Sequence, residues 1–169
     1  MLLREEKTLA NIGKLPLQWK IIFDCNPRGL LEASTWSQTM IVIREHSARK
    51  FGSLSYDPEG VLSLRLEAVA SLLESEQLPR TPEWSRIEIT YEERKVVELV
   101  ESTCFVPILS LSVNGREPTR WESRWNCYRH SARNIDDMKI VAYPQQDEWE
   151  HREGFEHPLI RGLVVLGKQ

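Results

Sequence analysis

Hydrophobic and polar residues alternate along much of the chain, which is the pattern of β-strands that bury one face. Residues 85–91 show it most clearly, because Ile87, Ile89 and Tyr91 alternate with charged and polar residues. Such a strand is typical of an antiparallel sheet with one solvated face. Similar apolar or alternating runs predict further strands at 18–24, 39–45, 51–56, 61–66, 96–101, 105–113, 138–143 and 159–167.

Turn residues divide these runs into hairpins. Residues 57–60, with the sequence DPEG, occupy the four positions of a type I turn in their preferred order, so a hairpin is predicted around them. Asn114 and Gly115 provide a tight turn at the end of a later strand. The polar residues 92–95 separate two apolar runs and predict another hairpin at that point.

Three other segments have apolar residues at helical spacing. Residues 2–15 place leucine and isoleucine side chains near one face, and residues 67–78 combine good helix formers before a pair of prolines. Residues 119–133 begin with a capping box, in which Thr119 is followed three positions later by Glu122. Each segment is therefore predicted to be a helix.

Together these elements predict an α+β fold in a single domain, residues 1–169. It is mainly an antiparallel sheet of about seven to nine strands with two or three packed helices. A chain of 169 residues is long enough to bury one core, and a hydrophobic content of 41% offsets the entropy lost on folding.

The overall charge argues against some classes of function. A net charge of −3 argues against a nucleic-acid coat or a polybasic membrane binder, which carry a strong basic excess. No apolar run approaches the roughly 18 residues that span a bilayer. The start, MLLREEKT, lacks the apolar region of a signal peptide, so a cytoplasmic protein without membrane association is expected. The three cysteines show no CxxC spacing, which predicts neither disulfides nor a zinc site.

Arginines and large aromatic residues interleave between positions 116 and 133, and two interpretations of this segment stay open. In one, Trp121 and Trp125 cover the sheet from the predicted helix while the arginines face water. In the other, the arginines bind an anion or a nucleic acid, with rings stacked on bases. The candidate anion-binding residues are Arg120, Arg124, Arg129 and Arg133.

Cys127 and His130 lie one helical turn apart in the same segment, so the imidazole could activate the thiol. A nucleophilic cysteine also needs donors for an oxyanion, and no glycine-rich turn stands beside Cys127. The chain has no P-loop, GxGxxG, GxSxG or HExxH motif either. We therefore expect no catalytic site and no cofactor, with a Cys127/His130 enzyme as the weaker alternative.

The segment 145–157 is strongly acidic. His151 and His157 are acceptable metal ligands, but their spacing matches no metal motif, so we expect no metal and interpret the segment as a solvated loop. Complementary charge speeds encounter between proteins, so such a loop suits a basic partner. The candidate partner-binding residues are Asp147, Glu148, Glu150, Glu153 and Glu156.

The order of elements in the first hundred residues resembles small immunity proteins of bacterial toxin systems. The resemblance lies in an N-terminal helix, a Trp-containing strand at 18–24, a meander, a second helix, and a hairpin introduced by PEW and continuing as SRIEITY. It implies an acidic, cytoplasmic, non-catalytic α+β protein that neutralises a toxin. Our leading hypothesis is therefore a toxin inhibitor that binds a protein partner. The alternative is a nucleic-acid or anion-binding domain that uses the helix at 119–133.

Overall fold

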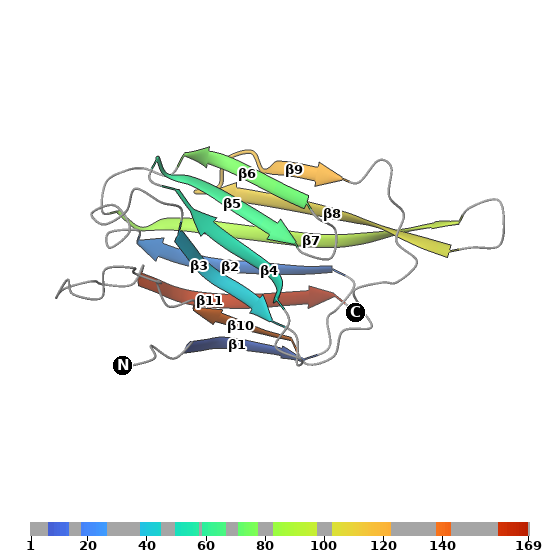
Figure 1. The fold of residues 1–169 in the computed structure, drawn as a ribbon, viewed down its shortest axis with the longest axis horizontal. Coiled ribbons are helices and arrows are strands. Elements are labelled where there is room, and N and C mark those ends of the chain that lie inside the picture. The colour runs from blue at the N-terminus through green and yellow to red at the C-terminus, as the bar shows by residue number, and fades with distance from the viewer. Residues whose placement is uncertain are drawn as a thin grey trace.

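The computed structural model describes residues 7–13, 18–26, 38–44, 50–57, 59–66, 71–77, 83–97, 103–122, 138–142 and 159–168. These residues form strands and the turns between them, and the described part contains no helix (Figure 1). The strands are β1 (Lys7–Gly13), β2 (Gln18–Asn26), β3 (Gln38–Arg44), β4 (Lys50–Tyr56), β5 (Val61–Leu66), β6 (Ser71–Gln77), β7 (Ser85–Val97), β8 (Thr103–Val113), β9 (Thr119–Glu122), β10 (Met138–Ala142) and β11 (Leu159–Lys168).

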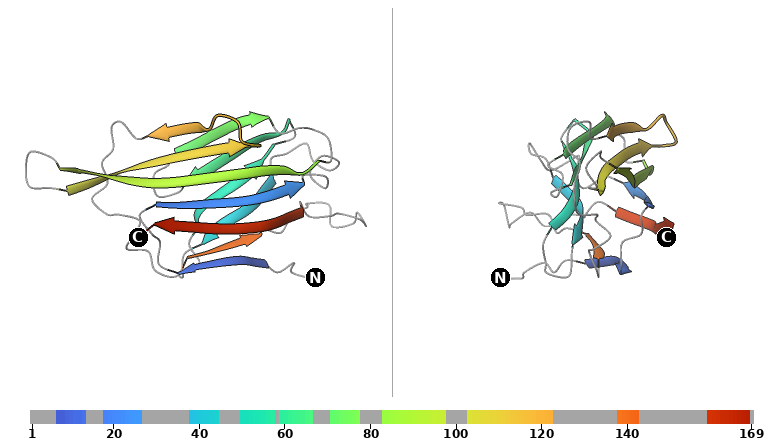
Figure 2. Two further views of the ribbon diagram at one scale, coloured as in Figure 1. Left: turned by 180° about the vertical axis from the view of Figure 1, so that it is seen from behind. Right: turned by 90° about the vertical axis from the view of Figure 1, so that its right-hand side faces the viewer.

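The strands form two antiparallel sheets that pack face to face. One sheet has six strands in the order β1-β10-β3-β4-β5-β6, and the other has five in the order β11-β2-β7-β8-β9. The end-on view in Figure 2 shows the two layers. Strands β7 and β8 extend past the other strands at one end (Figures 1 and 2). The architecture is a β-sandwich.

Alternation along the strands produces the core between the sheets. In β2, Trp19, Ile21, Phe23 and Cys25 are buried, whereas the residues between them are only half-buried. The facing strands contribute their own alternate residues, so one continuous apolar cluster joins both layers. Its members on β3, β4, β5, β7, β8 and β10 are Met40, Ile41, Ile43, Leu54, Tyr56, Leu62, Leu64, Ile87, Ile89, Tyr91, Leu109, Leu111, Val113 and Ile140.

The predicted α+β fold class is wrong, and β1 shows one physical reason. The ladder between β1 and β10 is irregular between Thr8 and Ala10 and again before Gly13. Such bulges break the two-residue alternation of a strand. As a result Leu9, Ala10 and Ile12 all pack against the core, and their spacing imitates one face of a helix.

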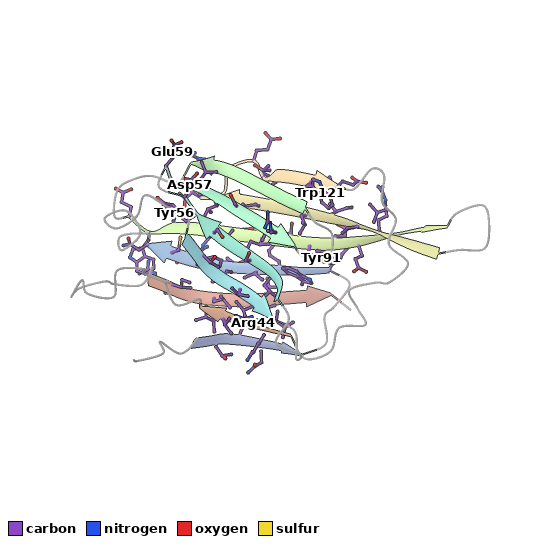
Figure 3. The ribbon with its side chains drawn as sticks, viewed as in Figure 1. Arg44, Tyr56, Asp57, Glu59, Tyr91 and Trp121 are labelled. Atoms are coloured by element: carbon purple, nitrogen blue, oxygen red, sulfur yellow. The ribbon has the colours of Figure 1, made fainter. Side chains whose placement is uncertain are left out.

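The other two predicted helices are also strands where the structure describes them. Strand β6 pairs with β5 along its whole length, so tertiary hydrogen bonding overrides the helix propensity of its residues. Strand β9 occupies the first four residues of the predicted helix at 119–133, and the rest of that segment lies outside the described residues. Trp121, labelled in Figure 3, lies on β9. It pairs with Leu109 and packs against the core.

The turns at residues 57–60 and at Asn114 and Gly115 were predicted correctly, but the hairpin predicted at residues 92–95 was placed at the wrong residues. Asp57 accepts hydrogen bonds through Oδ1 from the backbone nitrogens of Glu59 and Val61, at 2.9 and 2.8 Å. Asn114 and Gly115 have φ angles of 52° and 71°, as a tight hairpin turn requires. By contrast, β7 continues through the polar residues 92–95, because β8 pairs with it over that whole stretch.

Candidate binding groove on the five-stranded sheet

The outer face of the five-stranded sheet carries an open groove of about 740 Å³. Its lining comes from all five strands and from the residue just before β9. The lining residues are Gln18, Trp19, Lys20, Ile22, Thr90, Tyr91, Glu92, Ile108, Ser110, Pro118, Arg120, Leu166 and Gly167.

One row of side chains crosses the whole sheet along this groove. Leu166 lies opposite Lys20, Lys20 opposite Thr90, Thr90 opposite Ser110, and Ser110 opposite Arg120. Neighbouring strands lie about 4.8 Å apart, so the row from Leu166 to Arg120 spans roughly 19 Å. The five residues lie far apart in sequence, and only the register of the ladders brings them together.

The aromatic residues that line the groove turn their rings to the other side of the sheet. Trp19 and Tyr91 are buried, and their rings stack in the core with centroids 5.2 Å apart and an interplanar angle of 14°. Trp121, on the edge strand β9, also packs against the core. The groove therefore presents aliphatic and polar side chains to solvent, and no aromatic ring among the described residues.

Of the six polar side chains that line the groove outside the core, three are uncharged and three are charged. The hydroxyls of Thr90 and Ser110 lie within hydrogen-bonding distance of each other at its centre. The amide of Gln18 lies beside them, opposite the exposed carboxylate of Glu92. The floor between these groups is apolar, with Ile22 and Ile108 among its members. This combination offers several hydrogen-bond donors and acceptors over an aliphatic surface.

Charged residues on the same face form two clusters in which two arginines share one carboxylate. In the first cluster, at the β9 end of the groove, the carboxylate of Glu122 forms a close ion pair with Arg94. It forms a longer ion pair with Arg120, whose Nη2 lies 3.6 Å from Oε2 of Glu122. In the second, Asp24 pairs with Nε of Arg86 at 3.1 Å and Nε of Arg161 at 3.6 Å. Each cluster therefore keeps one positive charge in excess.

The remaining cation of the groove is already compensated. Nζ of Lys20 lies 3.2 Å from Oε2 of Glu88, its neighbour on β7. At the far end of the face, the guanidinium of Arg161 lies 3.8 Å from the ring centre of Trp84, which is a cation–π contact. The excess positive charge next to the groove is therefore at its β9 end, beside Arg120.

Two buried groups beneath this face are held in their neutral forms. Burial raises the pKa of the Cys25 thiol from 9.0 to about 12, and the charge of Asp24 adds to the effect. Burial also raises the pKa of Tyr91, and so do the charge of Glu93 and its 2.7 Å hydrogen bond with the Tyr91 hydroxyl. Neither group can act as a nucleophile or a base near neutral pH.

The structure places one of the candidate residues from sequence in the groove. Arg120 lies there, but on a strand rather than on the predicted helix. The other anion-binding candidates, Arg124, Arg129 and Arg133, lie outside the described residues, and so do Cys127 and His130. The acidic candidates Asp147, Glu148, Glu150, Glu153 and Glu156 also lie outside them, as do His151 and His157.

Sequence reasoning missed most of the groove. Lys20, Thr90, Ser110 and Glu92 are the outward members of alternating strands, a position that is normally only solvated. The one available signal was the pair of serines in 105–113, which mark a polar face without showing what lies beside it. In the described part of the chain, no group of three or more His, Cys, Asp or Glu residues could hold a metal.

No model of a known protein family matches the sequence, and no curated protein matches it. Solved structures do share its fold. Domains LG4-5 of the mouse laminin α1 chain match with a TM-score of 0.50 and 15% identity, over 96% of this chain and 40% of the laminin chain. The PL-14 alginate lyase of Aplysia kurodai gives 0.50 and 10%, over 93% and 72%. A Trypanosoma rangeli sialidase gives 0.48 and 11%, over 88% of this chain but only 20% of its own.

At sequence identities of 10% to 15%, the similarity to these structures shows the fold alone. The two neighbours with a TM-score of 0.50 are β-sandwich proteins rather than immunity proteins, and they comprise an enzyme and laminin domains. The fold therefore does not decide between catalysis and binding. In the described residues, no helix is long and apolar enough to cross a membrane.

Proposed function

We propose that this protein is a non-catalytic domain that binds an oligosaccharide in the groove on the five-stranded sheet. The observation that carries the proposal is the cross-strand row, in which Lys20, Thr90, Ser110 and Arg120 line one open channel. Sugars present many hydroxyl groups and an apolar ring face. The groove offers hydroxyls, an amide and a carboxylate above an aliphatic floor, so both features of a sugar find partners.

Two other ligand classes fit the groove less well. An extended peptide gains affinity by adding a strand to a sheet edge, but β2, β7 and β8 are paired on both sides where they line the groove. Single-stranded nucleic acid gains affinity by stacking its bases on exposed rings, and the rings of Trp19 and Tyr91 face the core.

A binding role fits the chemistry better than glycoside hydrolysis does. Hydrolysis usually needs two carboxyl groups that flank the scissile bond. Among the described residues that line the groove, Glu92 is the only acid. The nearby carboxylates of Glu88 and Glu122 are engaged in ion pairs. The alginate lyase of similar fold is named for a polysaccharide, which is a further reason to test carbohydrates first.

Neutralisation of a toxin stays a prediction. The element order behind that resemblance includes helices that are strands in the structure, and its acidic residues lie outside the described part. The arginine-rich helix predicted at 119–133 is not available to bind nucleic acid as expected, because the strand β9 occupies its first four residues.

A matched pair of variants tests the proposed function. Ser110 and Ser112 lie on the same face of β8, but only Ser110 lines the groove. On an array of neutral and acidic oligosaccharides, the native protein should bind a defined subset. Ser110→Leu, which removes a central hydroxyl and adds bulk, should weaken that binding roughly tenfold. Ser112→Leu should bind as the native protein does. Equal binding by both variants, or no binding by the native protein, would contradict the proposal.

A further inference from the structure

We infer that the groove selects sugar chains that carry a carboxylate, and that Arg120 is the residue that binds this carboxylate. This inference rests on the proposed function and specifies its ligand class as an oligosaccharide with uronic acid units. It follows from how charge is distributed along the groove, from the β11 end to the β9 end.

Arg120 is poised to accept a further anion. Its side chain is 61% exposed, and its contact with Glu122 is long, at 3.6 Å. A guanidinium has five N–H donors in a planar fork that matches a carboxylate in a bidentate pair. One distant carboxylate oxygen occupies few of these donors. The open side of Arg120 therefore remains available above Ser110, its neighbour in the row.

Arg94 prevents Glu122 from neutralising Arg120. The guanidinium of Arg94 forms the closer ion pair, with the other oxygen of the same carboxylate. Two positive groups thus share one negative group, and the pair of arginines keeps one uncompensated charge. Glu122 still holds Arg120 in place, because its Oε2 lies 3.6 Å from Nη2 of Arg120. Arg94 and Glu122 therefore act as positioning residues for the contact that Arg120 makes.

The rest of the groove favours uncharged hydroxyl groups. Lys20 is compensated by Glu88, and the exposed carboxylate of Glu92 would repel a second anion nearby. Glu92 can instead accept hydrogen bonds from sugar hydroxyls. Lys20 and Arg120 are three strands apart, a distance of roughly 14 Å. The groove therefore fits a chain with spaced carboxylates, one of which lies at the β9 end. A densely charged polyanion would meet repulsion at Glu92.

Calorimetric titration with two matched sugars tests the inference. One is a hexasaccharide of alternating glucuronic acid and N-acetylglucosamine, and the other is the same hexasaccharide with its carboxyl groups reduced to alcohols. The native protein should bind the acidic form roughly tenfold more tightly, as expected for one charge-assisted pair. Arg120→Gln should remove this preference, so that the variant binds the acidic and the reduced form with equal affinity.

Arg86→Gln is the matched control. Arg86 is 60% exposed, pairs with a shared carboxylate in the second cluster, and does not line the groove, so its replacement should keep the preference. Equal affinity of the native protein for both sugars would overturn the inference, and so would a preference that survives in Arg120→Gln. Failure of the inference would leave the proposed function standing if Ser110→Leu still weakens binding on the array.

Discussion

Alkaline pH should destabilise the protein through Cys25, and the size of the effect follows from the burial of its thiol. The pKa of this thiol is 9.0 in its ordinary environment and about 12 in the folded protein. Between these values the unfolded chain releases the proton while the folded chain retains it. The unfolded state therefore binds fewer protons, and the free energy of unfolding falls as pH rises. Below pH 9 both states keep the proton and the term vanishes.

The expected loss is about 1.4 kcal/mol at pH 10 and about 2.7 kcal/mol at pH 11 from Cys25 alone. Urea unfolding of the native protein and of Cys25→Ala, each at pH 8 and pH 10, isolates this term. The substitution leaves a cavity that lowers stability at both pH values, so only the difference between the two pH values matters. The native protein should lose about 1.4 kcal/mol more than the variant between pH 8 and pH 10. The same pH dependence in both proteins would refute the burial of this thiol in the core.

Three further substitutions test other parts of the structure. Trp121→Ala should lower the free energy of unfolding by about 2–4 kcal/mol, because the ring packs against the core, and urea titration will measure it. Gly115→Ala should cost about 1 kcal/mol by the same assay, because φ is 71° and the space around the glycine is open, so the cost is backbone strain alone. Arg94→Gln removes the second cation of the cluster, so the charge of Glu122 then compensates Arg120, and calorimetry should show a smaller preference for the acidic hexasaccharide. An unchanged preference would show that the two arginines do not compete for Glu122.

The strands were largely predictable because alternation is a local property. Residues 18–24, 51–56 and 105–113 all lie within strands of the structure, and the turn at 57–60 has the hydrogen bonds expected from its sequence. The three segments predicted as helices were wrong. In the first of them, bulges in β1 shift apolar residues to a helical spacing. In β6, pairing with β5 decided the outcome against local propensity.

The groove could not be predicted, because its residues meet only through strand register. Lys20, Thr90 and Ser110 come from three strands, and nothing near them in sequence shows that they are adjacent. Arg120 was selected as an anion-binding residue for its place in a basic segment. Arg120 was predicted to be exposed on one face of a helix. In the structure it is exposed because it alternates along a strand with Trp121, whose side chain packs against the core.

The position of bound sugar on the protein surface tests most directly whether the groove is the binding site. Two-dimensional ¹H–¹⁵N NMR spectra of the ¹⁵N-labelled protein, titrated with the oligosaccharide that binds best on the array, will show which backbone amides change. We predict that the largest shifts fall on Lys20, Thr90, Ser110 and Arg120, in one row across the five-stranded sheet. Shifts confined to the six-stranded sheet, such as those of β4 and β5, would contradict the assignment of the groove as the binding site.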